Sequence, residues 1–228
     1  MKKLFTIVAL AFCALTINAQ TTLSFSEVKA AGSLDGQTLS NTENNYTLSL
    51  TITDTKGKVS IDENNARFGT PESYVSFDHR LKSGGKSSSA NSMSLTIPAD
   101  GDLLVYARTA SSSATNRNLV LTQNDEELYN KVVQDADATS FTTDDGKTSK
   151  VFPVISVPVK QGTVDIAYPN GALNFYGFTF KDKAATGITK TLKAETAKDN
   201  ATYNLAGQRL NKDSKGVVIR NGKKFINK

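Results

Sequence analysis

Apolar and polar residues alternate along most of this chain in short runs that end in turn residues. The clearest unit covers residues 92–123, where the runs 92–98, 103–109 and 117–123 each alternate. The turn between the first two runs contains Gly101, which adopts positive φ without strain. Alternation with a period of two, broken by turns, predicts antiparallel strands with one buried face.

Similar runs on both sides of this unit predict further strands. They are residues 22–28, 46–54, 73–81, 127–133, 151–159, 162–168 and 173–180. The prolines in 151–159 predict an edge strand or bulges. The polar stretches 30–45, 62–71 and 134–149 are predicted to be loops. Short strands, frequent turns and the lack of an amphipathic pattern predict an all-β fold, an antiparallel β-sandwich of jelly-roll type.

The N-terminal residues 1–19 are predicted to be a cleaved signal peptide. Lys2 and Lys3 precede an apolar stretch that is short for a membrane span, and Ala19 is a small residue at the expected cleavage site. A buried helix or a membrane anchor is the alternative. No later stretch approaches transmembrane length, so we expect a secreted or cell-surface protein.

Cleavage after Ala19 changes the composition in two ways. It removes Cys13, the only cysteine, so the stability of the exported chain must come from core packing or bound ions. It also removes two lysines and no acidic residue, which leaves 25 basic against 22 acidic residues and lowers the net charge from +5 to +3. This mild charge does not indicate nucleic acid as a partner.

The end of the chain divides into a linker and a tail. Residues 183–200 are rich in Lys, Ala and Thr and read as a linker after a sandwich domain at 20–182. Residues 201–228 recover a β pattern, and Asn221-Gly222 between two runs predicts a hairpin. This small β unit is too short to bury a sizeable core of its own.

A motif in the tail is shared with known proteins. Its matching positions are Tyr203, Asn204, Gly207, Gln208, Arg209, Lys215, Gly216, Asn221, Gly222, Lys223 and Lys224. The tail resembles the C-terminal segment of secreted proteins of Bacteroidetes (Prevotella- and Bacteroides-like species), and the end of type IX secretion sorting domains. The resemblance implies a sorting role with the envelope or secretion machinery as partner; a folded add-on is the alternative.

A second set of motifs runs through residues 73–181. It consists of Leu81-Lys82, Gly84-Gly85, Ile97-Pro98-Ala99, Val105-Tyr106-Ala107-Arg108, Arg117 with Leu119-Val120-Leu121, and residues 174–180. This order resembles accessory modules of pectate lyases and galactose-binding-like carbohydrate-binding modules. The resemblance implies non-catalytic binding of a plant or host polysaccharide, although a shared fold alone does not establish sugar binding.

Two arginines are the first candidates for glycan contact. Arg108 and Arg117 flank a Ser/Thr/Asn loop, and a guanidinium offers a planar bidentate fork to hydroxyls or uronate carboxylates. They slightly favour acidic glycans and predict binding near the loops 82–91 and 109–117. Alternatively, each arginine ties its loop to nearby carbonyl groups. If both are bonded internally on a flat surface, a structural or adhesion protein of the envelope is favoured.

Three more side chains complete the predicted carbohydrate site. Tyr74 and Tyr176 offer rings for stacking on a sugar, with core packing as the alternative for Tyr176. His79 is the only histidine, and a lone histidine on a strand is more often a surface or packing residue than a base or metal ligand.

No catalytic motif is found, and we assign no catalytic residue. The sequence lacks G-x-S-x-G, H-E-x-x-H, a Cys/His pair and a Gly-rich phosphate loop. Two carboxylates facing each other across a cleft would indicate polysaccharide hydrolysis, the third alternative. No cofactor is predicted beyond a structural calcium ion at one of four acidic clusters, for which solvated loops are the alternative. These clusters are Asp62-Glu63, residues 125–127, Asp135 with Asp137, and Asp144-Asp145.

Overall fold

The computed structural model describes residues 19–28, 33–143 and 146–183, together with the backbone of 202–203, 209–210, 216–220 and 223–227. The chain divides into two compact units, Met1–Gly187 and Ile188–Lys228. The predicted signal peptide up to residue 18 and the predicted linker beyond residue 183 lie outside the described residues.

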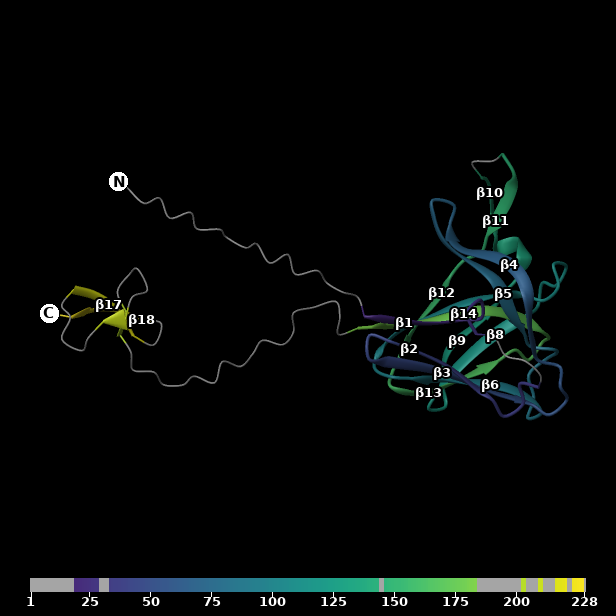
Figure 1. The fold of residues 1–228 in the computed structure, drawn as a ribbon, viewed down its shortest axis with the longest axis horizontal. Helices are drawn as coiled ribbons and strands as arrows, with labels where there is room; N and C mark the ends of the chain where they lie inside the picture. Colours follow the sequence, from purple (N-terminus) through teal and green to yellow (C-terminus); the bar gives the residue numbers. More distant parts are fainter. Residues whose placement is uncertain are drawn as a thin grey trace. The chain divides into compact units, whose positions relative to one another are not determined.

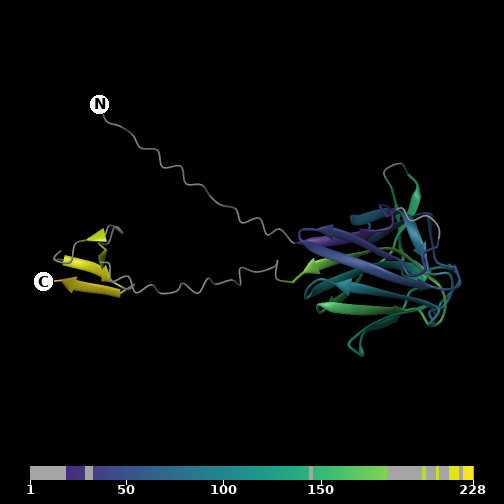
Figure 2. The same cartoon turned by 60° about the horizontal axis from the view of Figure 1, so that its bottom comes forward.

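The first unit is built from two antiparallel sheets that pack face to face, which confirms the predicted all-β sandwich (Figures 1 and 2). Sheet A has the spatial order β12 (Ile155–Val159), β7 (Gly101–Thr109), β14 (Leu173–Asp182), β5 (Ser73–Lys82) and β4 (Ser60–Thr70), and β1 (Gln20–Ser24) pairs with β14. Sheet B has the order β2 (Thr38–Glu43), β3 (Tyr46–Asp54), β6 (Asn91–Ile97), β13 (Gly162–Ala167), β8 (Asn118–Gln123) and β9 (Glu126–Val132).

The main core lies between the two sheets and follows from the alternation. In β6, Met93, Leu95 and Ile97 are buried, while the residues between them are not. On sheet A, β14 contributes Phe175 and Phe178, whose rings stack at 5.7 Å. Each fully buried side chain of this size contributes about 1.5–3 kcal/mol of transfer free energy. This core fixes both sheets.

A second apolar cluster covers the outer face of sheet A. It consists of Ala66, Phe68, Phe77, Tyr106, Phe152 and Tyr176, and we call it the outer cluster. Tyr106 lies on the outer face because its neighbours in β7 point into the main core. The ring of Phe68 lies 5.2–5.9 Å from four other rings of the cluster. Sheet A is therefore covered on both faces near β4.

Three stretches predicted to be loops contain strands, so these predictions are wrong. Residues 30–45 include β2, and residues 62–71 belong largely to β4. Residues 134–149 contain the 3-10 turn η1 (Asp135–Asp137) and a hairpin of β10 (Thr139–Thr142) and β11 (Thr148–Val151). Polar side chains on both faces hide β10 and β11 in the sequence, and a bulge between Glu63 and Ala66 breaks the period of β4.

Turns and edges agree better with the sequence. The β8–β9 hairpin turns at Asn124 and Asp125, whose φ angles of 52° and 63° suit a type I′ turn. The proline-containing strand β12 lies at the edge of sheet A, as predicted. The first strand is shorter than predicted and ends at Ser24.

The second unit is a small four-stranded antiparallel sheet. Its order is β16 (Arg209–Leu210), β15 (Thr202–Tyr203), β17 (Gly216–Arg220) and β18 (Lys223–Asn227). Arg220 pairs with Lys223, so β17 and β18 form the predicted hairpin with a two-residue connection. The motif residues Asn204, Gly207, Gln208, Lys215, Asn221 and Gly222 lie outside the described residues.

Candidate functional site

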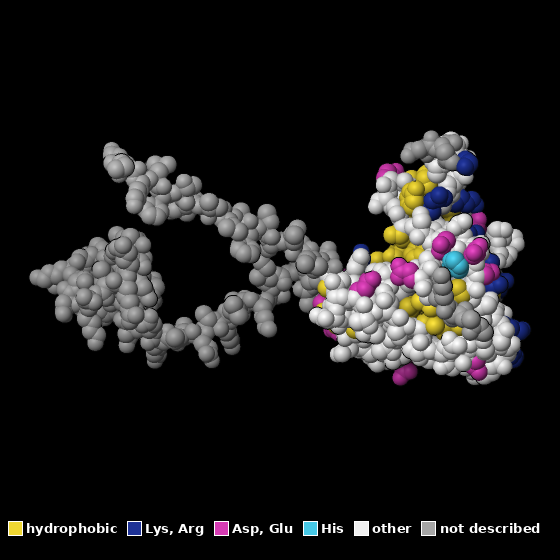
Figure 3. All heavy atoms as spheres, viewed as in Figure 1, with side chains coloured by type: hydrophobic (Ala, Val, Ile, Leu, Met, Phe, Trp, Pro, Cys, Tyr) yellow, Lys and Arg dark blue, Asp and Glu magenta, His cyan; other side chains and the backbone are white. Residues whose placement is uncertain are grey.

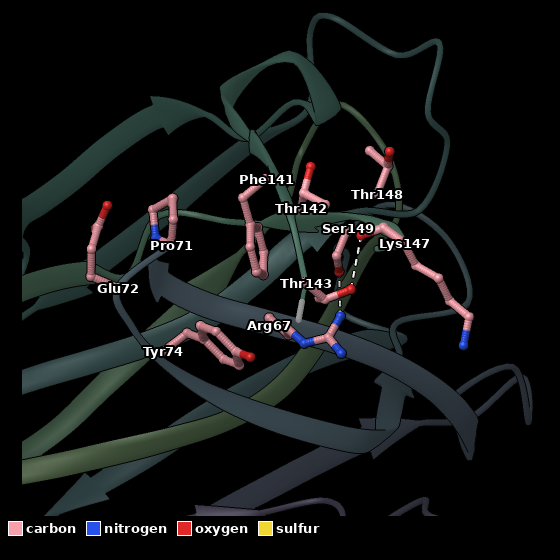
Figure 4. Close-up of a pocket in the computed structure, with 10 residues that line it drawn as sticks. All are labelled: Arg67, Pro71, Glu72, Tyr74, Phe141, Thr142, Thr143, Lys147, Thr148 and Ser149. Carbon is pink, nitrogen blue, oxygen red and sulfur yellow. Dashed lines mark hydrogen bonds between the residues drawn. The ribbon is translucent and has the colours of Figure 1, made fainter. Parts of the chain in front are cut away.

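A cleft of about 740 Å³ opens between the β4–β5 turn and the β10–β11 hairpin, and we call it the hairpin cleft (Figure 4). Its lining combines two aromatic rings, a guanidinium and several hydroxyl groups. The lining residues are Arg67, Pro71, Glu72, Tyr74, Phe141, Thr142, Thr143, Lys147, Thr148 and Ser149.

The β4–β5 turn positions one wall of this cleft. Gly69 pairs with Tyr74 and has a φ of +136°, a region that favours glycine. A side chain on Gly69 would meet the carbonyl oxygen of Ser73, so the two strands approach closely only because the residue is glycine. The close approach brings Tyr74 of β5 next to Arg67 of β4.

The aromatic wall has a partly exposed ring. Tyr74 is 40% exposed, and its ring centre lies 5.6 Å from that of Phe141 on the facing hairpin. The guanidinium carbon of Arg67 lies 5.5 Å from the centre of the Tyr74 ring. Figure 4 shows Pro71 and Tyr74 on one side of the cleft, with Glu72 beside them, and Arg67, Ser149 and Lys147 toward the other side.

The polar wall is made of Arg67 and the hairpin hydroxyls. Arg67 Nη1 donates a hydrogen bond to Ser149 Oγ, whereas its buried Nε has no hydrogen-bond partner. Thr143 Oγ1 donates to the carbonyl oxygen of Lys147 at 2.8 Å. The cleft thus offers aromatic faces for packing and polar groups for hydrogen bonds, the two kinds of contact that a small-ligand site combines.

The floor of the cleft is tied to the rest of the sandwich. Phe152 donates from its backbone N–H to the Arg67 carbonyl oxygen at 2.8 Å, and Gly69 donates to the Phe152 carbonyl oxygen at 2.9 Å. Phe68, between these two positions, is 1% exposed in the outer cluster. The backbone that carries Arg67 is therefore held by a packed layer, which reduces the entropy cost of binding.

Of the predicted site residues, the structure places only Tyr74 in the hairpin cleft. Arg108 Nη2 donates to Asp135 Oδ1 at 3.1 Å, and its guanidinium lies 4.5 Å from the centre of the Phe152 ring. Arg117 Nη1 donates to the Asn170 carbonyl oxygen at 2.6 Å. Both arginines are thus bonded internally, which is the observation that disfavours them as glycan contacts.

Asp135 completes the network around Arg108. Lys150 Nζ lies 2.9 Å from Asp135 Oδ2, and this bond, helped by Arg108, holds the pKa of the Asp135 carboxyl below its usual value. Asp135 is in η1 and Lys150 in β11, whereas Arg108 is in β7. The network therefore fastens the segment around β10 and β11 to the outer face of sheet A.

Tyr176 and His79 lie elsewhere. Tyr176 is 0% exposed, belongs to the outer cluster and donates its hydroxyl to Asn64 Oδ1; burial raises its pKa. A stacking role for Tyr176 is therefore wrong, because no face of its ring reaches the surface. His79 Nδ1 lies 2.9 Å from Asp78 Oδ1, beside a separate hollow of about 440 Å³.

Two of the described acidic clusters contain an ion-paired aspartate, Asp62 in one and Asp135 in the other. Asp62 pairs with Arg80 at 2.8 Å and with Lys82 at 2.9 Å. In the described ranges, no three His, Cys, Asp or Glu side chains come together as a metal site. Asp144 and Asp145 lie outside the described residues.

Among the described elements, no helix has the length and apolar character to cross a membrane.

Sequence reasoning missed Arg67, Phe141 and Ser149. Arg67 and Phe141 lay in stretches predicted to be loops, 62–71 and 134–149. The available signal was Phe141 itself, a single aromatic residue inside a long polar stretch. Its contact with Tyr74 depends on the hairpin reaching β4, which the local pattern does not encode.

Comparisons with known proteins show little similarity. No family model and no curated protein matches the chain. One similar solved structure is described as "The complexity of the Ruminococcus flavefaciens cellulosome reflects an expansion in glycan recognition", with 15% identity, a TM-score of 0.33, and coverage of 71% of this chain and 92% of that one. Another is the catalytic unit of a GH87 alpha-1,3-glucanase from Streptomyces thermodiastaticus, with 14% identity, a TM-score of 0.32, and coverage of 58% and 26%. Neither likeness says what this chain binds.

Proposed function

We propose that the sandwich is a non-catalytic carbohydrate-binding module whose site is the hairpin cleft. The observation that carries the proposal is the combination of the exposed Tyr74 ring with Arg67 and a row of hydroxyl groups in one cleft. An aromatic face can pack on the apolar face of a sugar ring, while the fixed donors beside it meet the hydroxyls.

The lining fits binding better than cleavage. Glycoside hydrolysis uses two carboxyl groups that flank the bond to be broken. Among the described lining residues, Glu72 is the one carboxylate, and Figure 4 places it at the end of the cleft away from Arg67. A binding site needs no such pair, and the chain's resemblance to accessory modules points in the same direction.

The test is a panel of pectins, hemicelluloses and host glycans offered to the purified protein, with and without calcium. We expect binding to one class, weakened about tenfold or more (1.4 kcal/mol) by Tyr74→Ala and by Phe141→Ala. Val75→Ala is the matched control, because Val75 is the next residue of β5, is 45% exposed and points to the opposite face. Binding that survives both cleft variants would place the site elsewhere.

The second candidate is a structural or adhesion protein of the cell envelope. The internal hydrogen bonds of Arg108 and Arg117 favour it. Both guanidinium groups already bond within the protein, as far as the structure describes it, so neither is offered to a glycan near the loops 82–91 and 109–117. No binding to any glycan of the panel by a folded protein would favour this candidate. Partners would then be sought among envelope proteins by cross-linking on intact cells.

We also infer that the protein is exported and that its tail directs where it goes. Support comes from the signal-like N-terminus, the motif at 203–224 that resembles Bacteroidetes sorting tails, and the tail's separate sheet. Deletion of residues 201–228 is expected to leave the melting temperature of the sandwich unchanged and to alter the protein's location. Unchanged location on cell fractionation would contradict a sorting role.

A further inference from the structure

Arg67 is the arginine that lines the hairpin cleft, and it differs from Arg80 and Arg108 in its partners. Arg80 and Arg108 each pair with a carboxylate, and Arg117 donates to a carbonyl oxygen. Among the residues that the structure describes, Arg67 has no carboxylate within ion-pair distance: its contacts are the Ser149 hydroxyl and the Tyr74 ring. Among these described residues, no carboxylate neutralises its positive charge.

The position of Arg67 makes this lack of a carboxylate significant. A guanidinium presents five N–H donors, and here one terminal nitrogen donates to Ser149 while Nε is buried without a partner. Nε is enclosed by protein atoms, as it is in Arg108 and Arg117, so an incoming anion meets the terminal N–H groups, where charge-assisted hydrogen bonds are strong. The backbone of Arg67 is bonded to Phe152, and its side chain is positioned by Ser149 and the Tyr74 ring.

The geometry of the cleft selects the kind of anion. The guanidinium lies over the Tyr74 ring, and Ser149 and Thr143 lie on its other side (Figure 4). A ligand that packs on Tyr74 and Phe141 therefore brings its edge to Arg67. The planar fork of arginine matches the two oxygens of a carboxylate. The carboxylate of Glu72, which would repel an anion, is exposed at the end of the cleft away from Arg67.

We propose that the hairpin cleft recognises a carboxylated sugar, with the uronate ring against Tyr74 and Phe141 and its carboxylate on Arg67. This inference rests on the proposed function and adds the class of ligand. Arg67 here takes the part that the sequence suggested for Arg108 and Arg117.

The decisive comparison uses two ligands that differ in the charge of the carboxyl group and in the methyl group that removes this charge. Oligogalacturonate and its methyl ester share ring and linkage, and the ester lacks the negative charge. By titration calorimetry we expect the purified protein to bind the acid at least tenfold more tightly than the ester. Binding of the acid should weaken as sodium chloride rises, while binding of the ester should not.

Two variants assign the effect to Arg67. Arg67→Gln should remove the preference for the acid, and Arg67→Lys, which keeps the charge without the fork, should keep part of it. Lys56→Gln makes the same change of net charge at an exposed turn residue outside the cleft and should change nothing. Thermal melts show whether each variant is folded. The comparison of acid and ester on the wild-type protein tests the inference even if a variant fails to fold.

The outcomes separate this inference from the proposed function. Equal binding of acid and ester, with both lost in Tyr74→Ala, would overturn the carboxylate inference and leave glycan binding at the cleft intact. Preference for a sulfated glycan without uronate residues over oligogalacturonate would also overturn it. Failure of every glycan to bind would refute the proposed function itself.

Discussion

The outer faces of the two sheets are built in opposite ways. The outer face of sheet B is a lattice of small hydroxyl side chains from adjacent strands: Thr38, Ser40, Thr42, Thr47, Ser49, Thr51, Thr53, Ser92, Ser94, Thr96 and Thr163. The outer face of sheet A carries the outer cluster, and the hairpin cleft lies at the end of β4 and β5, beside the β10–β11 hairpin. In Figure 3 the region over β2, β3 and β6 is mostly neither charged nor hydrophobic, whereas hydrophobic and basic side chains gather near β10 and β11.

The contrast shows how one sandwich can combine a face of paired hydroxyl groups with a sheet that carries additional layers. On sheet B, directly opposed hydroxyls satisfy one another, as in Ser40 with Ser49 at 2.8 Å and Thr42 with Thr47 at 2.8 Å. On sheet A, the aromatic rings of the outer cluster form a second layer, and the β10–β11 hairpin beside β4 and β5 forms the cleft. The aromatic, basic and hydroxyl groups that meet in the cleft therefore depend on these added elements. Substitutions in the outer cluster and the hairpin cleft should have the largest effects.

The largest effect is expected in the outer cluster. Phe68→Ala removes a ring that contacts four others and should lower the free energy of unfolding by about 3–5 kcal/mol. Because Phe68 lies next to Arg67, glycan binding should be lost as well. Urea unfolding followed by tyrosine fluorescence measures the first effect. A cost below about 1 kcal/mol would show that the outer cluster is loosely packed.

A backbone change at the cleft should have the next largest effect. Gly69→Ala places a side chain against the Ser73 carbonyl oxygen at a φ of +136°, and strain of this kind costs about 1–3 kcal/mol. The β4–β5 turn should shift and weaken binding. Gly85→Ala is the control, since a side chain there meets nothing closer than 3.9 Å. Equal melting temperatures for the two variants would mean that the turn adapts freely.

The network that fastens the β10–β11 segment should show as a pH dependence. The pKa of Asp135 is lowered in the folded state, so its contribution to stability is present above the unfolded value of about 3.9 and is lost as the pH falls through the folded value. Asp135→Asn should cost about 0.5–1 kcal/mol at pH 7 and less at pH 2.

Urea unfolding at both pH values measures this difference between wild type and variant. Asp165→Asn, at an exposed position on sheet B, is the control. If Asp135→Asn were equally costly at both pH values, the stabilisation would not come from the charge of Asp135.

The same contrast explains what the sequence could reveal. Strands of sheet B such as β3 and β6 have one face in the core and one in water, so their alternation predicts them directly. In β14 every residue from Leu173 to Phe180 is buried, so the pattern does not tell which rings pack in the main core and which in the outer cluster. For this reason the sequence left both stacking and core packing open for Tyr176. The cleft joins Arg67 of β4 to the distant β10–β11 hairpin through the Phe68–Phe152 bridge, and no local pattern records such a contact.

The smallest effect is expected on the hydroxyl lattice of sheet B. Thr38 and Thr51 face each other with their hydroxyl oxygens 3.2 Å apart and are both exposed. Changing both to Val keeps the branched shape that suits a strand and removes donor and acceptor together, which is close to neutral. The double variant should unfold within about 0.5 kcal/mol of wild type and bind glycans unchanged. Loss of binding in this variant, with Tyr74→Ala unaffected, would reverse the assignment of the two faces and make the hydroxyl lattice the binding surface.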